Sequence, residues 1–110
     1  MAVSTINQSN EILLVRNVDS TNRNILTITR NGNLYHVHYE RMQECGNGEA
    51  CTRIAAEYRP NTAQQAYSFY KQNSGYAPVQ GSLGTDGYIK LNATKYNENV
   101  AGTFDWFYTK

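Results

Sequence analysis

Charged residues are scarce in this sequence, and no run of one sign stands out. Lysine and arginine number 10 and aspartate and glutamate 9, which is 17% of the 110 residues and a formal net charge of +1. Proteins that bind DNA, RNA or an anionic membrane surface normally gather their basic residues into patches. The scattered charges therefore predict no nucleic-acid partner.

Long apolar runs are also missing. No stretch approaches the roughly 18 consecutive apolar residues that a membrane-spanning helix requires, so we expect no membrane insertion. The first ten residues, MAVSTINQSN, lack the apolar segment of a secretory signal peptide. The sequence as given therefore predicts either a cytoplasmic protein or a mature form whose leader has been removed.

Only two cysteines are present, Cys45 and Cys51, on either side of a short glycine-containing loop. Pairing them across a hairpin also sets Met42 opposite Ile54, which is a sensible antiparallel register that brings the thiols within disulfide reach. We therefore predict a Cys45–Cys51 disulfide. Disulfides persist in oxidising compartments, so this prediction favours a secreted or periplasmic protein, whereas free thiols would favour the cytoplasm.

Residues typical of turns and strands, by contrast, are abundant, and the clearest pattern is a hairpin over residues 24–42. Asn31-Gly32 separates two runs rich in β-branched and aromatic residues, which is the strongest short-range hairpin signal. With these two residues as the loop, Ile28 faces Tyr35. The apolar side chains on one face are expected to be buried: Leu26, Ile28, Tyr35, Val37 and Tyr39. The opposite face carries Ile25, Thr27, Thr29, Leu34, His36 and His38.

The rest of the chain predicts further strands and one helix. Strand patterns cover residues 11–16, 51–58, 79–83, 88–92 and 101–109. A helix is predicted over residues 62–73, because Thr62 and Gln65 can form a capping box. Its apolar stripe, at helical spacing, consists of Ala63, Ala66, Tyr67 and Tyr70. The predicted fold is α+β but mostly β, a single domain over residues 1–110, with an antiparallel sheet or small barrel of six to seven strands.

The most distinctive candidate site is the row of His36, His38 and Glu40, which alternate along one predicted strand and share a face. Metal sites on sheets use this spacing, but two histidines alone provide too few ligands, so we predict a binding surface without metal. The sequence has no Gly-x-Ser-x-Gly elbow and no glycine-rich loop before a helix. It therefore predicts no catalytic residue and no cofactor.

The loop between the cysteines is a second candidate surface, since loops held by rigid strands often bear function. Its residues are Gly46, Asn47, Gly48 and Glu49. Together these features predict a small non-enzymatic binding protein, exported, that acts by protein–protein contact as an inhibitor, immunity protein or adaptor. Two alternatives are a β-barrel that holds an apolar or sugar-like small ligand, and a metal-dependent enzyme that uses His36 and His38.

Overall fold

The computed structural model describes residues 10–72 and 75–110. These residues form eight strands and one short 3₁₀ helix: β1 (Glu11–Asp19), β2 (Asn24–Asn31), β3 (Leu34–Cys45), β4 (Ala50–Arg53), η2 (Ala56–Tyr58), β5 (Gln64–Gln72), β6 (Gly75–Leu83), β7 (Tyr88–Ala93) and β8 (Val100–Thr109). The prediction of a mostly β chain is confirmed, but six to seven strands was too few. Within the described residues no helix is long or apolar enough to cross a membrane.

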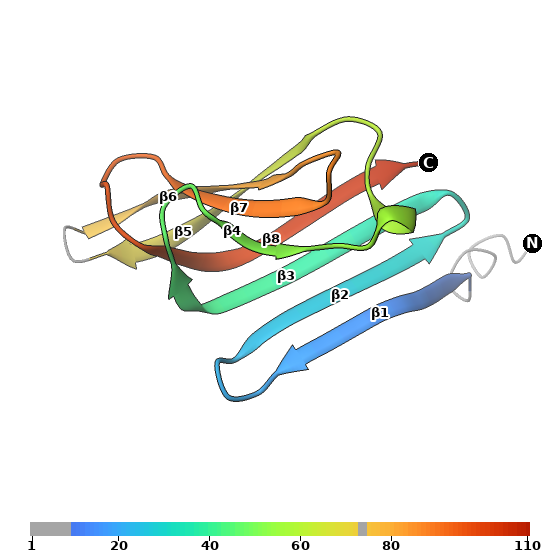
Figure 1. Ribbon diagram of the computed structural model, residues 1–110, viewed down its shortest axis with the longest axis horizontal. Coiled ribbons are helices and arrows are strands. Elements are labelled where there is room, and N and C mark those ends of the chain that lie inside the picture. The colour runs from blue at the N-terminus through green and yellow to red at the C-terminus, as the bar shows by residue number, and fades with distance from the viewer. Residues whose placement is uncertain (1–9, 73–74) are drawn as a thin grey trace, which may run out of the picture.

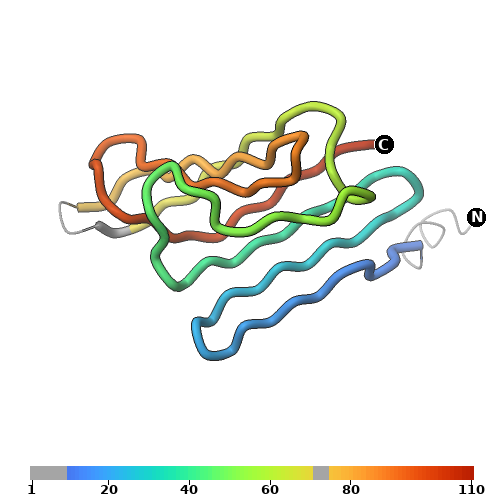
Figure 2. The backbone as a smooth tube through the Cα atoms, viewed as in Figure 1, coloured from blue at the N-terminus to red at the C-terminus, as the bar shows by residue number. Residues whose placement is uncertain are grey.

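The strands form two antiparallel sheets of four strands each, which lie in two layers (Figure 1). Sheet A has the strand order β1-β2-β3-β8 and sheet B the order β4-β7-β6-β5. The chain crosses from sheet A to sheet B between β3 and β4 and returns between β7 and β8 (Figure 2). At one side the edge strands β5 and β8 run close together, and the Thr103 amide donates to Ser68 Oγ at 3.2 Å. At the other side β1 and β4 are edges that pair with no further strand among the described residues, so the fold is an open sandwich and not a closed barrel.

Apolar residues that alternate along the strands fill the space between the sheets, as expected for a sandwich. They are Leu26, Ile28, Val37, Tyr39, Phe104, Trp106 and Tyr108 from sheet A, and Val79, Leu83, Ile89 and Leu91 from sheet B. The indole Nε1 of Trp106 donates a 3.1 Å hydrogen bond to the Gly81 carbonyl, which ties β8 to β6. Aromatic rings therefore occupy the interior, where a ligand-binding barrel would have its cavity.

The predicted hairpin is present, but its loop begins one residue later than predicted. Asn31 pairs with Leu34, so Gly32 and Asn33 form the loop. Gly32 has φ 62°, and Arg23 is the one described non-glycine residue with positive φ. A positive φ at the first central residue alone fits a type II′ turn and not the type I′ turn expected for Asn-Gly. The pairing shifts by two residues, so every side chain stays on the predicted face.

The predicted helix over residues 62–73 is wrong, because residues 64–72 form β5, which pairs with β6 along its length. Ala66 and Tyr70 share a face in a helix and also in a strand, so their spacing did not distinguish the two. Tyr67 and Phe69 are 64% and 66% exposed on the other face of the strand. Aromatic residues favour strands, and the pairing with β6 outweighs the local helix signal. Residue 73 lies outside the described residues.

Candidate functional site on the outer face of sheet A

The pairing of β3 with β8 brings four side chains together on the outer face of sheet A. His38 lies directly opposite Asp105, and His36 lies opposite Phe107. Because side chains alternate along a strand, all four project away from the core. Asp105 is 67 residues from His38 along the chain, and only this strand pairing makes them neighbours.

One carboxylate oxygen lies between the two imidazole rings. Asp105 Oδ1 is 2.7 Å from His36 Nε2 and 2.7 Å from His38 Nδ1. The remaining ring nitrogen of His38, Nε2, is 3.0 Å from Glu40 Oε2. The His36 ring stacks on Phe107 with 4.2 Å between the ring centroids. We call His36, His38, Glu40 and Asp105 the histidine cluster, and the sequence predicted three of its four members as a shared surface.

His38 and Asp105 shift each other's protonation equilibria. Partial burial lowers the pKa of His38, but hydrogen bonds to Asp105 and Glu40 outweigh burial, and the net shift is upward. Partial burial raises the pKa of Asp105, but hydrogen bonds from the two imidazoles outweigh it, and the net shift is downward. Both directions are those of an ion pair, in which a protonated imidazole donates from both nitrogens.

A groove of about 420 Å³ lies beside Asp105 over the other three members of the cluster, and its lining consists of Glu11, Arg16, Thr27, Thr29, His36, His38 and Glu40. Large apolar side chains stand around it on the same face. Their exposed fractions are 58% for Leu13, 53% for Val18, 43% for Leu34 and 57% for Phe107. We call these four residues and the histidine cluster the outer A face. It combines a charged centre with an apolar surround.

The predicted loop surface lies elsewhere. The amide of Gly48 donates to the Leu91 carbonyl at 2.7 Å, and Asn47 Oδ1 accepts from the Ala93 amide at 2.8 Å. The loop is therefore fastened to β7 of sheet B, and Gly48 takes φ 81°, a conformation that favours glycine. Gly46 and Glu49 belong to the same turn, joined by a 3.0 Å backbone hydrogen bond. The structure does not join this loop to the histidine cluster.

The predicted disulfide is absent, and so is the hairpin on which it was based. Cys45 lies opposite Val100 of β8, whereas Cys51 belongs to β4, which pairs with β7. The chain changes sheets between the two cysteines, so they meet across the sandwich edge and not across a hairpin. Both thiols are free and half-buried. The Cys51 thiol donates to the Glu49 carbonyl at 3.9 Å, and the two thiols are close enough to shift each other's pKa. The predicted partner of Met42, Ile54, is instead a buried core residue.

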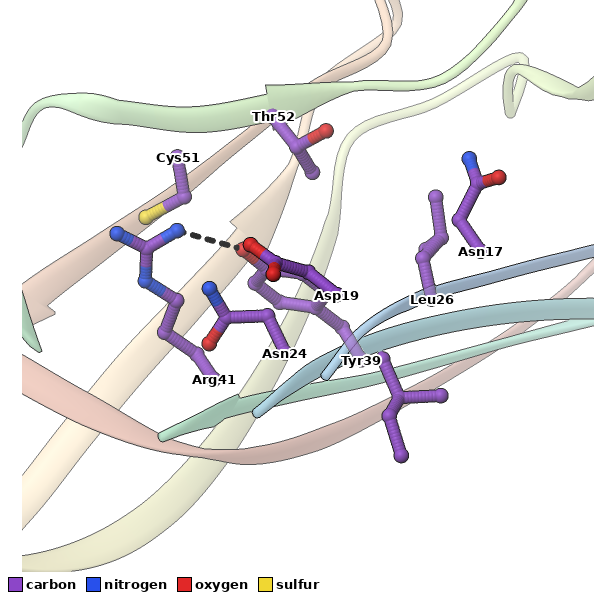
Figure 3. A pocket seen from close by; sticks show the side chains of 9 residues that line it. Asn17, Asp19, Asn24, Leu26, Tyr39, Arg41, Cys51 and Thr52 are labelled. Atoms are coloured by element: carbon purple, nitrogen blue, oxygen red, sulfur yellow. Dashed lines mark hydrogen bonds between the residues drawn. The ribbon is translucent and has the colours of Figure 1, made fainter. Parts of the chain in front are cut away.

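A second concave region lies between the sheets, where β2 and β3 face β4 (Figure 3). Its lining consists of Asn17, Asp19, Asn24, Ile25, Leu26, Tyr39, Arg41, Cys51 and Thr52, and its volume is about 210 Å³. Arg41 Nη1 donates to the Tyr39 hydroxyl at 3.3 Å within it. Pockets for drug-sized ligands have volumes of roughly 300–1,000 Å³, so this pocket is smaller than such a ligand requires.

Sequence reasoning missed the two residues that β8 contributes to the outer A face, Asp105 and Phe107. The alternation of Phe104, Trp106 and Tyr108 already indicates that the residues between them face the other way. No local signal, however, pairs this last strand with the histidine strand. Comparison of the sequence with protein-family models and with curated proteins found no match. What the site does is therefore inferred from its own residues and their geometry.

Proposed function

We propose that this protein is a small non-enzymatic binding protein that acts by protein–protein contact through the outer A face. The observation that carries the proposal is the set of four large apolar side chains, 43–58% exposed, around one polar centre on an open sheet face. Several large apolar side chains exposed on one face around polar groups are typical of interaction sites on soluble proteins. Isolated exposed apolar residues would carry no such meaning.

Phe107 is the expected anchor of the contact. It is 57% exposed, and its stacking on His36 at 4.2 Å holds the ring in one orientation before any partner arrives. Rigid aromatic side chains near the centre of an interface contribute a large share of binding energy. The histidine cluster beside it offers hydrogen-bonding groups of both charge signs, which favours specificity.

The chemistry of the same face supports binding in preference to catalysis. Both nitrogens of His38 are engaged by carboxylates, so neither is directed at a nucleophile. The residues that line the groove include no cysteine, serine or lysine. The two thiols lie at the sandwich edge, on the interior side of the sheets. Of the groove's two threonines, Thr27 accepts a 3.4 Å hydrogen bond at Oγ1 from Arg16 and not from a histidine, so the described groove holds no nucleophile paired with a base, the arrangement that group-transfer enzymes use.

Two matched substitutions test the proposal. Phe107→Ser removes an exposed ring from the outer A face, and Phe69→Ser removes one with a similar exposure, 66%, from sheet B. Wild type and both variants are immobilised and incubated with an extract of the source cells, and captured proteins are quantified by mass spectrometry. We expect one partner to be retained by Phe69→Ser and reduced about 30-fold by Phe107→Ser, because loss of an aromatic hot spot costs about 2 kcal/mol.

Equal capture by the two variants would contradict the proposal. Loss with Phe69→Ser alone would place the contact on sheet B, where Phe69 stacks on Tyr76 at 6.4 Å between ring centroids. If a sugar-like compound raised the melting temperature and no protein were captured, the small-ligand alternative would be favoured.

A further inference from the structure

Three side chains with metal-ligating atoms converge at one point of the outer A face. One ligand atom from each of His36, His38 and Asp105 lies within 4.8 Å of the other two. Ligands of a tetrahedral zinc ion, each about 2.05 Å from the metal, are about 3.3 Å apart. The Asp105 oxygen lies 2.7 Å from each ring nitrogen, so modest outward rotation of these exposed side chains would open space for an ion.

Neighbouring side chains hold the two imidazole rings in the way that histidines bound to a metal are usually held. A histidine that binds a metal through one nitrogen usually donates its other N–H to a carboxylate. His38 has this arrangement: Nδ1 points at the convergence point, and Nε2 lies 3.0 Å from Glu40 Oε2. The stacking of His36 on Phe107 fixes the plane of the second ring. A surface cluster formed by chance would require neither the Glu40 hydrogen bond nor the stacking on Phe107.

We propose that His36 Nε2, His38 Nδ1 and the Asp105 carboxylate bind one divalent transition-metal ion of the zinc class, with Glu40 as the hydrogen-bond partner of His38. Two imidazole nitrogens and one carboxylate suit zinc, cobalt, nickel or copper, whereas calcium and magnesium take oxygen ligands. On binding, both ligating nitrogens must be unprotonated: His38 would release its Nδ1 proton to solvent and keep Nε2–H for Glu40, and His36 would carry its ring proton on Nδ1. Three protein ligands leave one position open to water or to a partner's side chain. This inference goes beyond the proposed function and does not depend on it.

The cysteine pair is the competing site that the experiment must exclude, because Cys45 and Cys51 could also hold zinc. The test therefore uses the full chain carrying Cys45→Ser and Cys51→Ser, stripped of metal with a chelator and titrated with zinc chloride in a calorimeter. Cobalt chloride provides a second readout, since bound cobalt shows visible absorption that reports its ligand geometry. Circular dichroism confirms that each variant is folded.

We expect one equivalent of zinc to bind to the cysteine-free chain. His36→Ala and Asp105→Asn should each weaken binding at least about 100-fold, and Glu40→Gln about 10-fold, as for hydrogen-bond partners of metal ligands. Glu57→Gln, which changes an exposed carboxylate on η2, should have no effect. The proposal would be overturned if replacing the two cysteines were enough to abolish zinc binding, or if neither zinc nor cobalt bound. Zinc binding that His36→Ala leaves unchanged would also overturn it.

Discussion

At the scale of single residues, Cys45 is a side chain whose chemistry its surroundings alter strongly. A hydrogen bond from the Cys51 thiol lowers the pKa of Cys45 to about 7, with partial burial opposing the shift and Arg41 adding to it. The same hydrogen bond raises the pKa of Cys51. One thiol of the pair is therefore about half ionised near neutral pH, while the other keeps its proton.

This difference predicts selective alkylation. Because the pKa of Cys45 is lowered, its thiolate is present above about pH 7 and is lost as the pH falls through that value. The rate at which iodoacetamide modifies Cys45 should rise to half its plateau near pH 7, compared with about 8.5 for an ordinary thiol. Peptide mass spectrometry across the pH range measures both cysteines separately, and Cys51 should react more slowly throughout.

Cys51→Ala is the matching control for the alkylation experiment, because alanine cannot donate the hydrogen bond. In that variant the pH at which Cys45 reaches half its maximal alkylation rate should be higher than in the wild type. Equal rates for the two cysteines in wild type, or a midpoint that Cys51→Ala leaves unchanged, would show that the thiol pair does not set the reactivity.

The histidine cluster shows what can be predicted at this scale. The alternation of His36, Val37 and His38 was enough to place both rings on one face, and the structure confirms it. Asp105 could not be assigned to the same point, because its contact with His38 spans 67 residues. Side-chain direction follows from local periodicity, whereas partners across a sheet follow from strand order.

At the scale of secondary-structure elements, β6 approaches β8 closely at Gly81. A Cβ added there would lie 2.5 Å from Phe104 Cδ1, and Phe104 is only 1% exposed. The Gly81 carbonyl also accepts the hydrogen bond from Trp106. Because Gly81 has no side chain, the Phe104 ring of sheet A can pack directly against the β6 backbone of sheet B.

Gly81→Ala is therefore expected to destabilise the protein by about 1–3 kcal/mol, the usual cost of overpacking a filled core. Glycine-to-alanine changes otherwise stabilise by about 0.4–1 kcal/mol through the unfolded chain, so the sign of the effect identifies the steric contact. Chemical denaturation followed by circular dichroism measures the difference. Ser82→Ala, at the half-exposed neighbour, should change stability by less than about 0.5 kcal/mol. A neutral or stabilising Gly81→Ala would mean that the sheets can separate there without cost.

Elements were predicted unevenly, for reasons that particular residues make clear. The hairpin of β2 and β3 was identified from its turn and its alternation, and the two-residue error in pairing changed no face. β5 was mistaken for a helix because Ala66 and Tyr70 fit both periods, and because a capping box could be drawn from Thr62 and Gln65. Residues 64–72 form a strand because they pair with β6, and nothing within the segment itself specifies that partner.

At the scale of the whole molecule, the strands of sheet A contribute unequally to the core. No side chain of β1 is fully buried. Strand β3, by contrast, contributes Val37 and Tyr39 to the core, and β8 contributes Phe104 and Trp106. The edge formed by β1 is therefore expected to open without disturbing the rest of the sandwich.

Native-state hydrogen exchange would measure this difference. Amides of β3 and β8 should exchange only through global unfolding, while those of β1 should exchange through openings at least about 2 kcal/mol less costly. Spectra recorded at increasing low concentrations of denaturant separate the two classes. Identical protection across β1, β3 and β8 would instead indicate that all of sheet A unfolds as one cooperative unit.

The order of strands was the part of the architecture least accessible from sequence. Residues 101–109 were correctly assigned to a strand with Phe104, Trp106 and Tyr108 on one side, but nothing in them specifies β3 as the neighbour. The disulfide prediction failed for the same reason, since Cys45 and Cys51 were assumed to share a hairpin. Non-local pairing depends on the energy of the complete sandwich.

The position of Trp106 has a practical consequence. It is the chain's single tryptophan, it is 2% exposed, and its indole bonds to the opposite sheet. The protein thus contains one intrinsic fluorophore at the junction of its layers. The wavelength of its emission reports directly whether that junction is dry, and separation of the layers can be followed in real time without attaching a dye.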